Sequence, residues 1–226
     1  MNPAAYSIVI PVLNECDALE HLLPALRRQF PAAEVLVVDG GSTDSSVARA
    51  LRSSDQLLIC KPGRASQMNL GARAARGRYL LFLHADTLPL FSEELLLNWM
   101  AMQFRWGFCR VQLSGAGAAL RIIECAMNVR SRLTGVATGD QLLVVRRDWF
   151  LEQGAFAEQP LMEDVEICKR LRRIVSPAVL DAVVQTSSRR WEEQGVVSTV
   201  LRMWALRLAY VCGVSPRRLW QFYYGS

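Results

Sequence analysis

Short apolar runs alternate with helix-like segments throughout the first half of the chain. The runs occupy residues 7–12, 34–38, 57–60 and 79–83, and helical patterns separate them at residues 17–29, 44–51 and 65–76. Strands that alternate with helices predict an α/β fold, in which helices cover both faces of a mostly parallel sheet. Ligands of such sheets bind beyond the carboxyl ends of the strands, so polar residues that follow an apolar run are the candidates for function.

The second half is less regular. Helical patterns are expected at residues 92–105, 118–133, 163–174 and 196–212, and extended segments at residues 108–113, 141–145 and 179–186. No internal repeat and no linker composition separates two domains. We therefore expect one α/β domain over residues 1–195, followed by an amphipathic helical extension of the same domain over residues 196–226.

Charge is distributed unevenly along the 226 residues, whose formal net charge is +5. Between Lys169 and Arg218 lie ten basic and three acidic residues, which is +7, so the rest of the chain carries −2. A basic C-terminal third suits a phosphate-bearing ligand or an anionic membrane surface. Nucleic acid is disfavoured as a partner, because no recognised nucleic-acid-binding motif accompanies the charge.

The six cysteines form no C-x-x-C pair. Free thiols in a reducing compartment are expected for a chain of this size. The N-terminal residues do not have the pattern of a secretory signal, so a cytoplasmic protein is expected. The most apolar window, residues 196–214, contains Arg202 and Arg207, so it does not have the pattern of a membrane-spanning helix.

The first two predicted strands end in polar residues. Asn14 and Glu15 follow the first strand, which lacks the glycine-rich turn of a dinucleotide-binding fold. Asp39 ends the second strand within Val-Val-Asp-Gly-Gly-Ser-Thr-Asp, where Thr43 or Asp44 is expected to cap the next helix. The carboxylate of Asp39 is suited to accept hydrogen bonds from a base or ribose; the alternative is a simple turn residue.

The fourth strand ends in His84-Ala-Asp86. A carboxylate there is suited to bind Mg²⁺ or Mn²⁺ that bridges a diphosphate. The alternatives are that Asp86 caps a turn before Pro89 and that His84 is a core histidine. With His21 as the only other histidine, a histidine-rich zinc site is excluded.

Two further groups of polar residues occur late in the chain. Glu163 and Asp164 open a predicted helix, where either carboxylate is a candidate general base and where acidic residues also favour the helix dipole. Arg189, Arg190 and Trp191 place two guanidinium groups beside an indole, a combination suited to phosphate and sugar; a solvated basic turn is the alternative.

These motifs together resemble those of family 2 glycosyltransferases. The segments Ser-Ile-Val-Ile-Pro-Val-Leu-Asn-Glu, Val-Val-Asp-Gly-Gly-Ser-Thr-Asp, His-Ala-Asp, Glu-Asp and Arg-Arg-Trp occur in the order seen in that family, over residues 6–191. Residues 63–71, 82–87 and 186–191 are similar to one bacterial subgroup, the radical-SAM/selenodomain-associated transferase 2 type. The resemblance implies a GT-A fold, a three-layer sandwich, and inversion at the anomeric carbon.

The resemblance also implies roles for individual residues. Asp164 would match the catalytic base, beside Glu163, and Asp86 would match the last aspartate of a metal-binding D-x-D motif, with His84 in place of the first. The predicted nucleotide-sugar contacts are Pro11, Asn14, Glu15, Asp39, Arg64, Gln67, Arg190 and Trp191. Ser187 stands where the family's Q-x-x-R-W motif has glutamine, which departs from the pattern.

The resulting hypothesis is a metal-assisted, inverting glycosyltransferase that uses a UDP- or GDP-sugar, with Asp39, Asp86 and Asp164 around one cleft. The alternatives are a sugar-phosphate nucleotidyltransferase and a non-catalytic nucleotide-sugar or lipid-surface binding module. The acceptor is left open, with a lipid-linked acceptor as one candidate. An apolar stripe is formed by Val197, Val200, Leu201, Trp204, Leu208 and Val211. It predicts packing on the core, a dimer contact or an interfacial surface at the inner face of a membrane.

Overall fold

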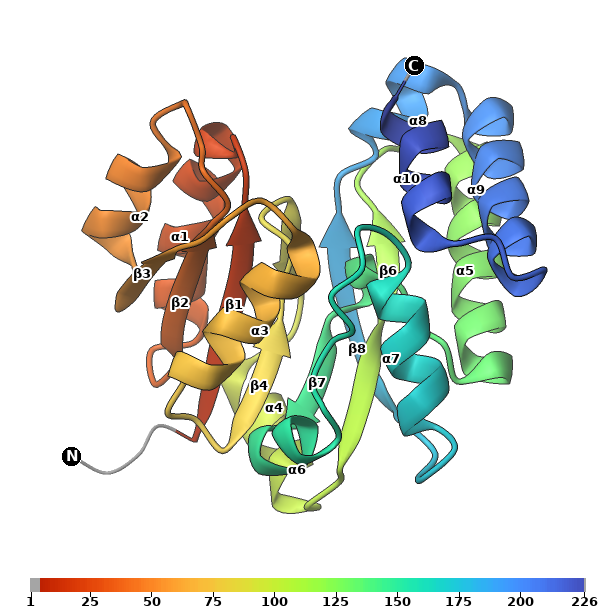
Figure 1. The fold of residues 1–226 in the computed structure, drawn as a ribbon. Helices are drawn as coiled ribbons and strands as arrows, with labels where there is room; N and C mark the ends of the chain where they lie inside the picture. Colours follow the sequence, from red (N-terminus) through yellow and green to blue (C-terminus); the bar gives the residue numbers. More distant parts are fainter. Residues whose placement is uncertain (1–4, 226) are drawn as a thin grey trace.

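The computed structural model describes residues 5–225, apart from the side chains of Arg190 and Val197. Its centre is an eight-stranded sheet in the order β3-β2-β1-β4-β7-β6-β8-β5, covered by helices on two sides (Figure 1). The predicted three-layer α/β fold is therefore confirmed.

The first half of the chain forms a parallel unit. Its elements are β1 (Tyr6–Val12), α1 (Cys16–Gln29), β2 (Glu34–Asp39), α2 (Ser46–Ser53), β3 (Gln56–Ile59), α3 (Arg64–Ala74) and β4 (Tyr79–Phe82). β1 pairs in parallel with β2 and β4, and β2 pairs in parallel with β3. The expected cap of α2 was wrong by one or two residues: Ser45 is its N-cap, and the Asp44 carboxylate accepts a hydrogen bond from the N–H of Ser46 at 2.9 Å.

The second half makes the sheet mixed. Its elements are β5 (Thr87–Pro89), α4 (Glu93–Ala101), β6 (Trp106–Leu113), α5 (Ala118–Thr134), η1 (Gly139–Gln141), β7 (Leu143–Arg146), α6 (Arg147–Glu152), α7 (Glu163–Leu171) and β8 (Ala178–Thr186). β7 runs antiparallel to β4 and β6, while β6 and β8 are parallel. Neither β5 nor α6 was predicted. The three residues of β5 are extended because they pair antiparallel with β8, and a pairing of this range has no local signal.

Alternate residues of the central strands supply two separate cores. On one face Ile8 and Ile10 of β1 pack with Leu19, Leu23 and other residues of α1, α2 and α4. On the other face Val9 packs with residues of α3, α6 and α7, Met68 and Ile167 among them. Strand residues two apart share a face, so a strand buried on both sides reads as one continuous apolar run.

The C-terminal segment forms α8 (Arg189–Gln194), α9 (Val196–Val211) and α10 (Pro216–Tyr224), which lie beside α5 (Figure 1). Trp191, Val196 and Val200 pack against Leu120 and Ile123 of α5. Among residues 5–225, no helix combines the length and apolar character needed to cross a bilayer. The proposed division of the chain at residue 195 stays a prediction.

One expectation for α9 was wrong. Most of its predicted apolar stripe does not pack on the core: Val200 packs against α5, but Leu201, Trp204, Leu208 and Val211 are 65%, 74%, 66% and 69% exposed. Another side of α9 is buried, where Thr199 and Leu206 are 2% and 4% exposed. Val197 was also predicted for this stripe, and its side chain is not among those that the structure describes. α9 is apolar around most of its circumference, so periodicity alone could not decide which side packs.

All six cysteines are free, as predicted. Cys109 and Cys168 are buried, which raises the pKa of the Cys168 thiol to about 12, whereas Cys125 and Cys212 are exposed. The reducing compartment itself stays a prediction.

Candidate active site

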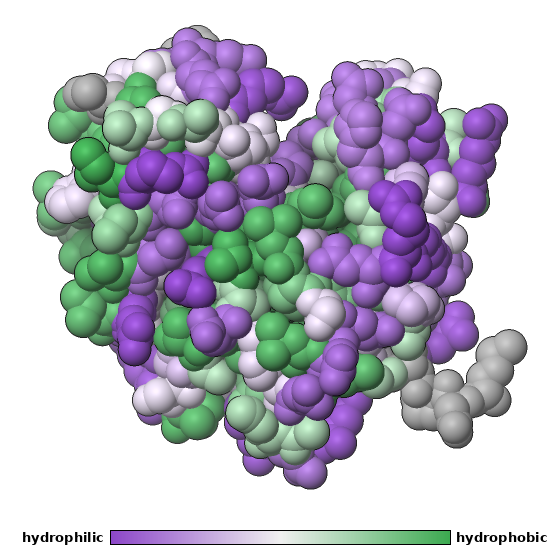
Figure 2. All heavy atoms as spheres, turned by 180° about the vertical axis from the view of Figure 1, so that it is seen from behind, coloured by the Kyte–Doolittle hydropathy of each residue, from purple (hydrophilic) through white to green (hydrophobic). Residues whose placement is uncertain are grey.

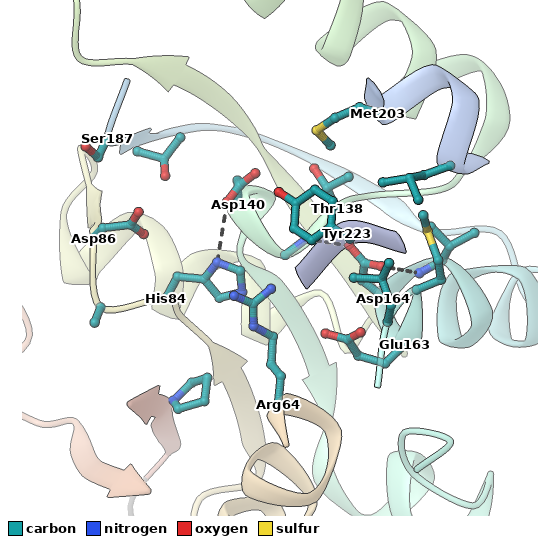
Figure 3. Close-up of a pocket in the computed structure, with 18 of the residues that line it drawn as sticks. Arg64, His84, Asp86, Thr138, Asp140, Glu163, Asp164, Ser187, Met203 and Tyr223 are labelled. Carbon is teal, nitrogen blue, oxygen red and sulfur yellow. Dashed lines mark hydrogen bonds and ion pairs between the residues drawn. The ribbon is translucent and has the colours of Figure 1, made fainter. Parts of the chain in front are cut away.

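A cleft of about 240 Å³ opens at the carboxyl edge of the sheet, between the end of β4 and the first turn of α7. Side chains from both halves of the chain point into it (Figure 3). Most of the residues predicted for the site line this cleft: Pro11, Glu15, Arg64, His84, Asp86, Glu163, Asp164 and Trp191. The sequence motifs therefore converge although they are far apart in the chain.

An open groove of about 690 Å³ adjoins the cleft and shares Glu15, Asp86 and Arg189 with it. Asn14 lines this groove rather than the cleft. Its side-chain oxygen accepts a hydrogen bond from the N–H of Thr43 at 2.8 Å, and its backbone has φ 56°, a left-handed conformation that asparagine tolerates. Asn14 thus fastens the loop after β1 to the loop after β2.

One carboxylate oxygen of Asp39 is hydrogen-bonded within the protein and the other has no partner among the described residues. Oδ2 accepts hydrogen bonds from the N–H groups of Gly41 and Ser42 at 2.8 and 2.9 Å. Oδ1 is buried and has no hydrogen-bond partner among the described residues. The side chain is 2% exposed and lies beside the cleft rather than in its lining. A buried acceptor without a partner is costly, so Oδ1 is suited to an N–H or O–H group of a ligand.

Gln67 occupies a structural position. Its amide nitrogen donates to the carbonyl oxygens of Val12 and Val38, each at 2.8 Å, and its side chain is 4% exposed. It therefore ties together the ends of β1 and β2. The amide nitrogen of Gln67 is therefore used by the two strands, and its predicted direct contact with the nucleotide sugar stays a prediction.

His84 has neighbours on both edges of its ring, and its predicted role as a metal ligand stays a prediction. Its Nδ1 lies 3.4 Å from a carboxylate oxygen of Asp140 (Figure 3). The other edge of the ring lies against Gly139, where a Cβ would collide with Nε2. The ring of His84 therefore lies between Asp140 and Gly139.

Asp86 and Glu15 supply the carboxylate oxygens that magnesium and manganese ions prefer as ligands. Asp86 is exposed at the end of β4, and burial and then the negative charge of Asp86 raise the pKa of Glu15. A cation would relieve this repulsion. The described residues contain no cluster of three or more metal-ligating side chains. Mg²⁺ is commonly held by one or two carboxylates and substrate phosphates, so this pair is compatible with it.

The first turn of α7 carries the acidic pair. Asp164 accepts hydrogen bonds from the N–H groups of Gly139 at 3.0 Å and Val165 at 2.7 Å, one on each oxygen. Glu163 is 5% exposed, and burial and the charge of Asp164 raise its pKa to about 6. Met162, which precedes them, has φ 66°, an uncommon conformation for this residue type. The backbone thus fixes the direction of both carboxylates.

Arg64, at the start of α3, points toward His84 and the acidic pair (Figure 3). Crowding by protein atoms around the cleft lowers the pKa of its guanidinium. The charges of Glu163 and Asp140 more than compensate, so the net shift is upward. The cleft therefore holds a fixed positive charge beside its carboxylates.

The basic turn predicted near the end of the chain is the start of α8. Arg189 lines both the cleft and the groove. Trp191 lines the cleft and also packs against Leu113 and Leu120, so it supports the wall as well as forming it. Arg190 was also predicted to bind the ligand, and its side chain lies outside the described residues.

Sequence reasoning missed several residues of the cleft. Those contributed by the second half of the chain are Thr138, Asp140, Met203, Leu206, Arg207, Tyr223 and Tyr224. Thr-Gly-Asp at residues 138–140 directly precedes an apolar run, which was a usable signal. The residues of α9 and α10 had none, because their position depends on how these helices pack.

Comparison with known proteins agrees with this arrangement. The family model described as Glycosyl transferase family 2 matches residues 7–99. That segment belongs to glycosyl transferase family 2. An uncharacterized glycosyltransferase of Haemophilus influenzae is 33% identical over 109 residues, 44% of this chain and 44% of that protein. The PGL/p-HBAD biosynthesis glycosyltransferase of Mycobacterium tuberculosis is 37% identical over 89 residues, 36% of this chain and 35% of that protein. Each match spans less than half the relative's length.

Solved structures share the fold over a larger part of the chain than residues 7–99. Mannosyltransferase PcManGT from Pyrobaculum calidifontis, in complex with GDP-Man and Mn²⁺, is 20% identical with a TM-score of 0.61, over 81% of this chain and 57% of that one. S. aureus TarS in complex with UDP-GlcNAc is 18% identical with a TM-score of 0.54, over 80% of this chain and 58% of that one. These likenesses confirm the predicted GT-A fold.

Proposed function

We propose that this protein transfers a glycosyl residue from a nucleoside-diphosphate sugar to an acceptor hydroxyl, with inversion at the anomeric carbon. The observation that carries the proposal is one cleft with Asp86 on one side, Asp164 on the other and Arg64 pointing into the space between them. Membership of residues 7–99 in family 2 supports the reaction class. The donors bound by PcManGT and TarS support a GDP- or UDP-sugar for this chain.

The donor would lie along the ends of β1, β2 and β4. The free oxygen of Asp39 would accept a hydrogen bond from the base or ribose, beside Pro11. Arg64 and Arg189 would bind the diphosphate, because guanidinium groups pair well with phosphate oxygens. A divalent cation held by Asp86 and Glu15 would stabilise the negative charge of the leaving diphosphate.

Asp164 is the general base of the proposed reaction. Each of its oxygens keeps a free lone pair after accepting one backbone hydrogen bond. Asp164 takes the proton of the acceptor hydroxyl as that oxygen forms a bond to the anomeric carbon. The bond from this carbon to the diphosphate oxygen breaks, and its electron pair leaves with the diphosphate. Attack on the face opposite the leaving group inverts the configuration.

Glu163 is a positioning residue in this mechanism. Its charge and that of Asp140 act on Arg64 and raise the pKa of the guanidinium. A carboxylate buried beside a guanidinium restrains where that guanidinium can go. Glu163 would therefore keep Arg64 in the cleft when the diphosphate leaves.

A thermal-shift comparison of UDP and GDP, each with and without Mn²⁺, tests the donor half of the proposal. One nucleotide should raise the melting temperature, and Mn²⁺ should enlarge the shift, because ligands that bind the folded state stabilise it. Asp86→Ala should remove the Mn²⁺ enhancement. Asp181→Ala is the matched control, since Asp181 lies on β8 with a side chain 91% exposed. Equal enhancement in parent and Asp86→Ala would place the cation elsewhere, and no shift with either nucleotide would contradict the proposal.

A further inference from the structure

The outer side of α9 is an unusually apolar surface for a soluble protein. Leu201, Trp204, Leu208 and Val211 follow one another at intervals of three or four residues, so they share one side of the helix. Each is about two-thirds exposed or more, at 65%, 74%, 66% and 69%. Large apolar patches of this kind mark interaction sites.

α5 extends this surface. Ile122, Val129 and Leu133 are 71%, 51% and 80% exposed, and Cys125 between them is also exposed. The two helices touch through Ile123 of α5 and Val200 of α9, so their exposed sides adjoin this contact. Figure 2 shows apolar side chains gathered along the edge of the molecule that carries these helices. We call Ile122, Val129, Leu133, Leu201, Trp204, Leu208 and Val211 the apolar surface.

The charges on α5, α9 and α10 are mainly positive. In the sequences of α5, α9 and α10 Glu124 is the single acidic residue, and Arg121 pairs with it at 2.8 Å. Arg132, Arg217 and Arg218 are exposed. Exposed aromatic side chains accompany them on α10, where Trp220 and Tyr224 are 42% and 55% exposed.

We propose that the apolar surface docks onto a bilayer that contains anionic phospholipid. Leucine and tryptophan enter the boundary between headgroups and acyl chains, and arginines beside them attract anionic headgroups. A second copy of the chain is the weaker candidate. A two-fold symmetric contact would place the same patch against itself and bring like-charged arginines together.

The other side of the same helices lines the cleft. Met203 and Leu206 of α9 and Tyr223 of α10 contribute to its wall. Docking would therefore bring the cleft close to the bilayer, and an acceptor carried on a membrane lipid would reach Asp164 without a spanning helix. This consequence rests on the proposed function, whereas the docking itself does not.

Co-sedimentation with vesicles tests the docking. The protein should pellet with vesicles of equal phosphatidylglycerol and phosphatidylcholine at low ionic strength and much less with phosphatidylcholine alone. Leu201→Ser/Leu208→Ser should weaken partition into the vesicles about 10-fold or more, because each substitution removes the favourable free energy of moving a leucine side chain from water into the bilayer. Leu51→Ser/Ile59→Ser, at positions 67% and 64% exposed on α2 and β3, is the matched control and should bind like the parent.

Charge reversal tests the electrostatic part. Arg217→Glu/Arg218→Glu should weaken binding to anionic vesicles about 10-fold or more, and about 0.5 M salt should have a similar effect on the parent. Arg28→Glu/Arg52→Glu changes the net charge equally at exposed positions of α1 and α2, and it should retain most of the binding. Circular dichroism and the UDP or GDP thermal shift should be unchanged in all four variants, which separates docking from folding and from the proposed function.

Three results would overturn the proposal. The first is no binding to anionic vesicles at low salt. The second is equal loss in a variant and its control. The third is a dimer in sedimentation velocity that Leu201→Ser/Leu208→Ser dissociates while vesicle binding persists, which would assign the apolar surface to a second copy.

Discussion

The two sides of the cleft are built in different ways. The side formed by the ends of β1, β2 and β4 is held by specific hydrogen bonds, such as those from the N–H of Thr43 to Asn14 and from Gln67 to Val12 and Val38. The opposite side consists of η1, α7 and the C-terminal helices, where Trp191, Met203 and Leu206 meet the cleft through packing.

The family match follows the same division. It covers residues 7–99, the parallel part of the sheet and the segment through α4, and ends before the opposite wall begins. A nucleotide diphosphate imposes the same hydrogen-bonding requirements on every enzyme that binds it, whereas acceptors differ in shape and polarity. The comparison suggests that the first side serves the shared donor and the second side serves the acceptor of this chain.

The largest expected effect separates chemistry from binding. Asp164→Asn keeps the size of the side chain and removes the proton acceptor, so turnover should fall by about 10²- to 10⁴-fold. Release of nucleoside diphosphate from the preferred sugar nucleotide measures turnover, and the nucleotide thermal shift should stay at the parental value. Near-normal turnover would show that Asp164 is not the general base, and the side of the cleft that contains α7 would then have no identified catalytic residue.

The next prediction concerns the hydrogen-bonded side. Gln67→Leu leaves the carbonyl oxygens of Val12 and Val38 without their shared donor, which should lower the free energy of unfolding by about 2–4 kcal/mol. Urea denaturation measures this loss. Gln112→Leu, at a half-buried position of β6, should lower the free energy of unfolding much less. A small effect of Gln67→Leu would show that packing also holds the first side together.

Glu163 gives a pH-dependent prediction of intermediate size. In the folded protein its pKa is about 6, raised from 4.5 by burial and by Asp164, so the folded state holds this proton at pH values where the unfolded chain has lost it. Stability attributable to Glu163 should therefore fall as pH rises through 4.5 and 6, by about 2 kcal/mol in total between about pH 3.5 and about pH 7. Urea denaturation of parent and Glu163→Gln across this window isolates the effect. Parallel pH profiles for the two proteins would argue against a raised pKa.

The smallest expected effect tests the packed side. Tyr223→Ala removes a ring that lies 5.2 Å from the Arg202 guanidinium, so stability should fall by about 1 kcal/mol. Nucleotide affinity should stay within about twofold of the parent if this side serves the acceptor. A large loss of nucleotide binding would show that α10 also contacts the donor and would break the proposed division.

Much of the first side could be predicted from the chain alone. Apolar runs identified β1 to β4, and the residues directly after them include Glu15 and Asp86 of the cleft. This works because parallel strands joined by helices all end at the same edge, so position along the chain determines position in space. The structural role of Gln67 could not be predicted, since a polar side chain in a ligand-binding motif gives no sign that two strand carbonyls use its donor.

The sequence by itself determined the parallel half of the sheet, the similarity of residues 7–99 to glycosyl transferase family 2, and the acidic pair at the start of α7. Each of these depends on neighbours within a few residues or on a motif of fixed order. Only the tertiary structure decided which side of α9 is exposed, that Asp140 holds His84, and that Tyr223 reaches the cleft. α9 is apolar around most of its circumference, so several of its sides could have been buried. Contacts with α5, which is remote in the sequence, and with α10 selected one of them and left the apolar surface exposed.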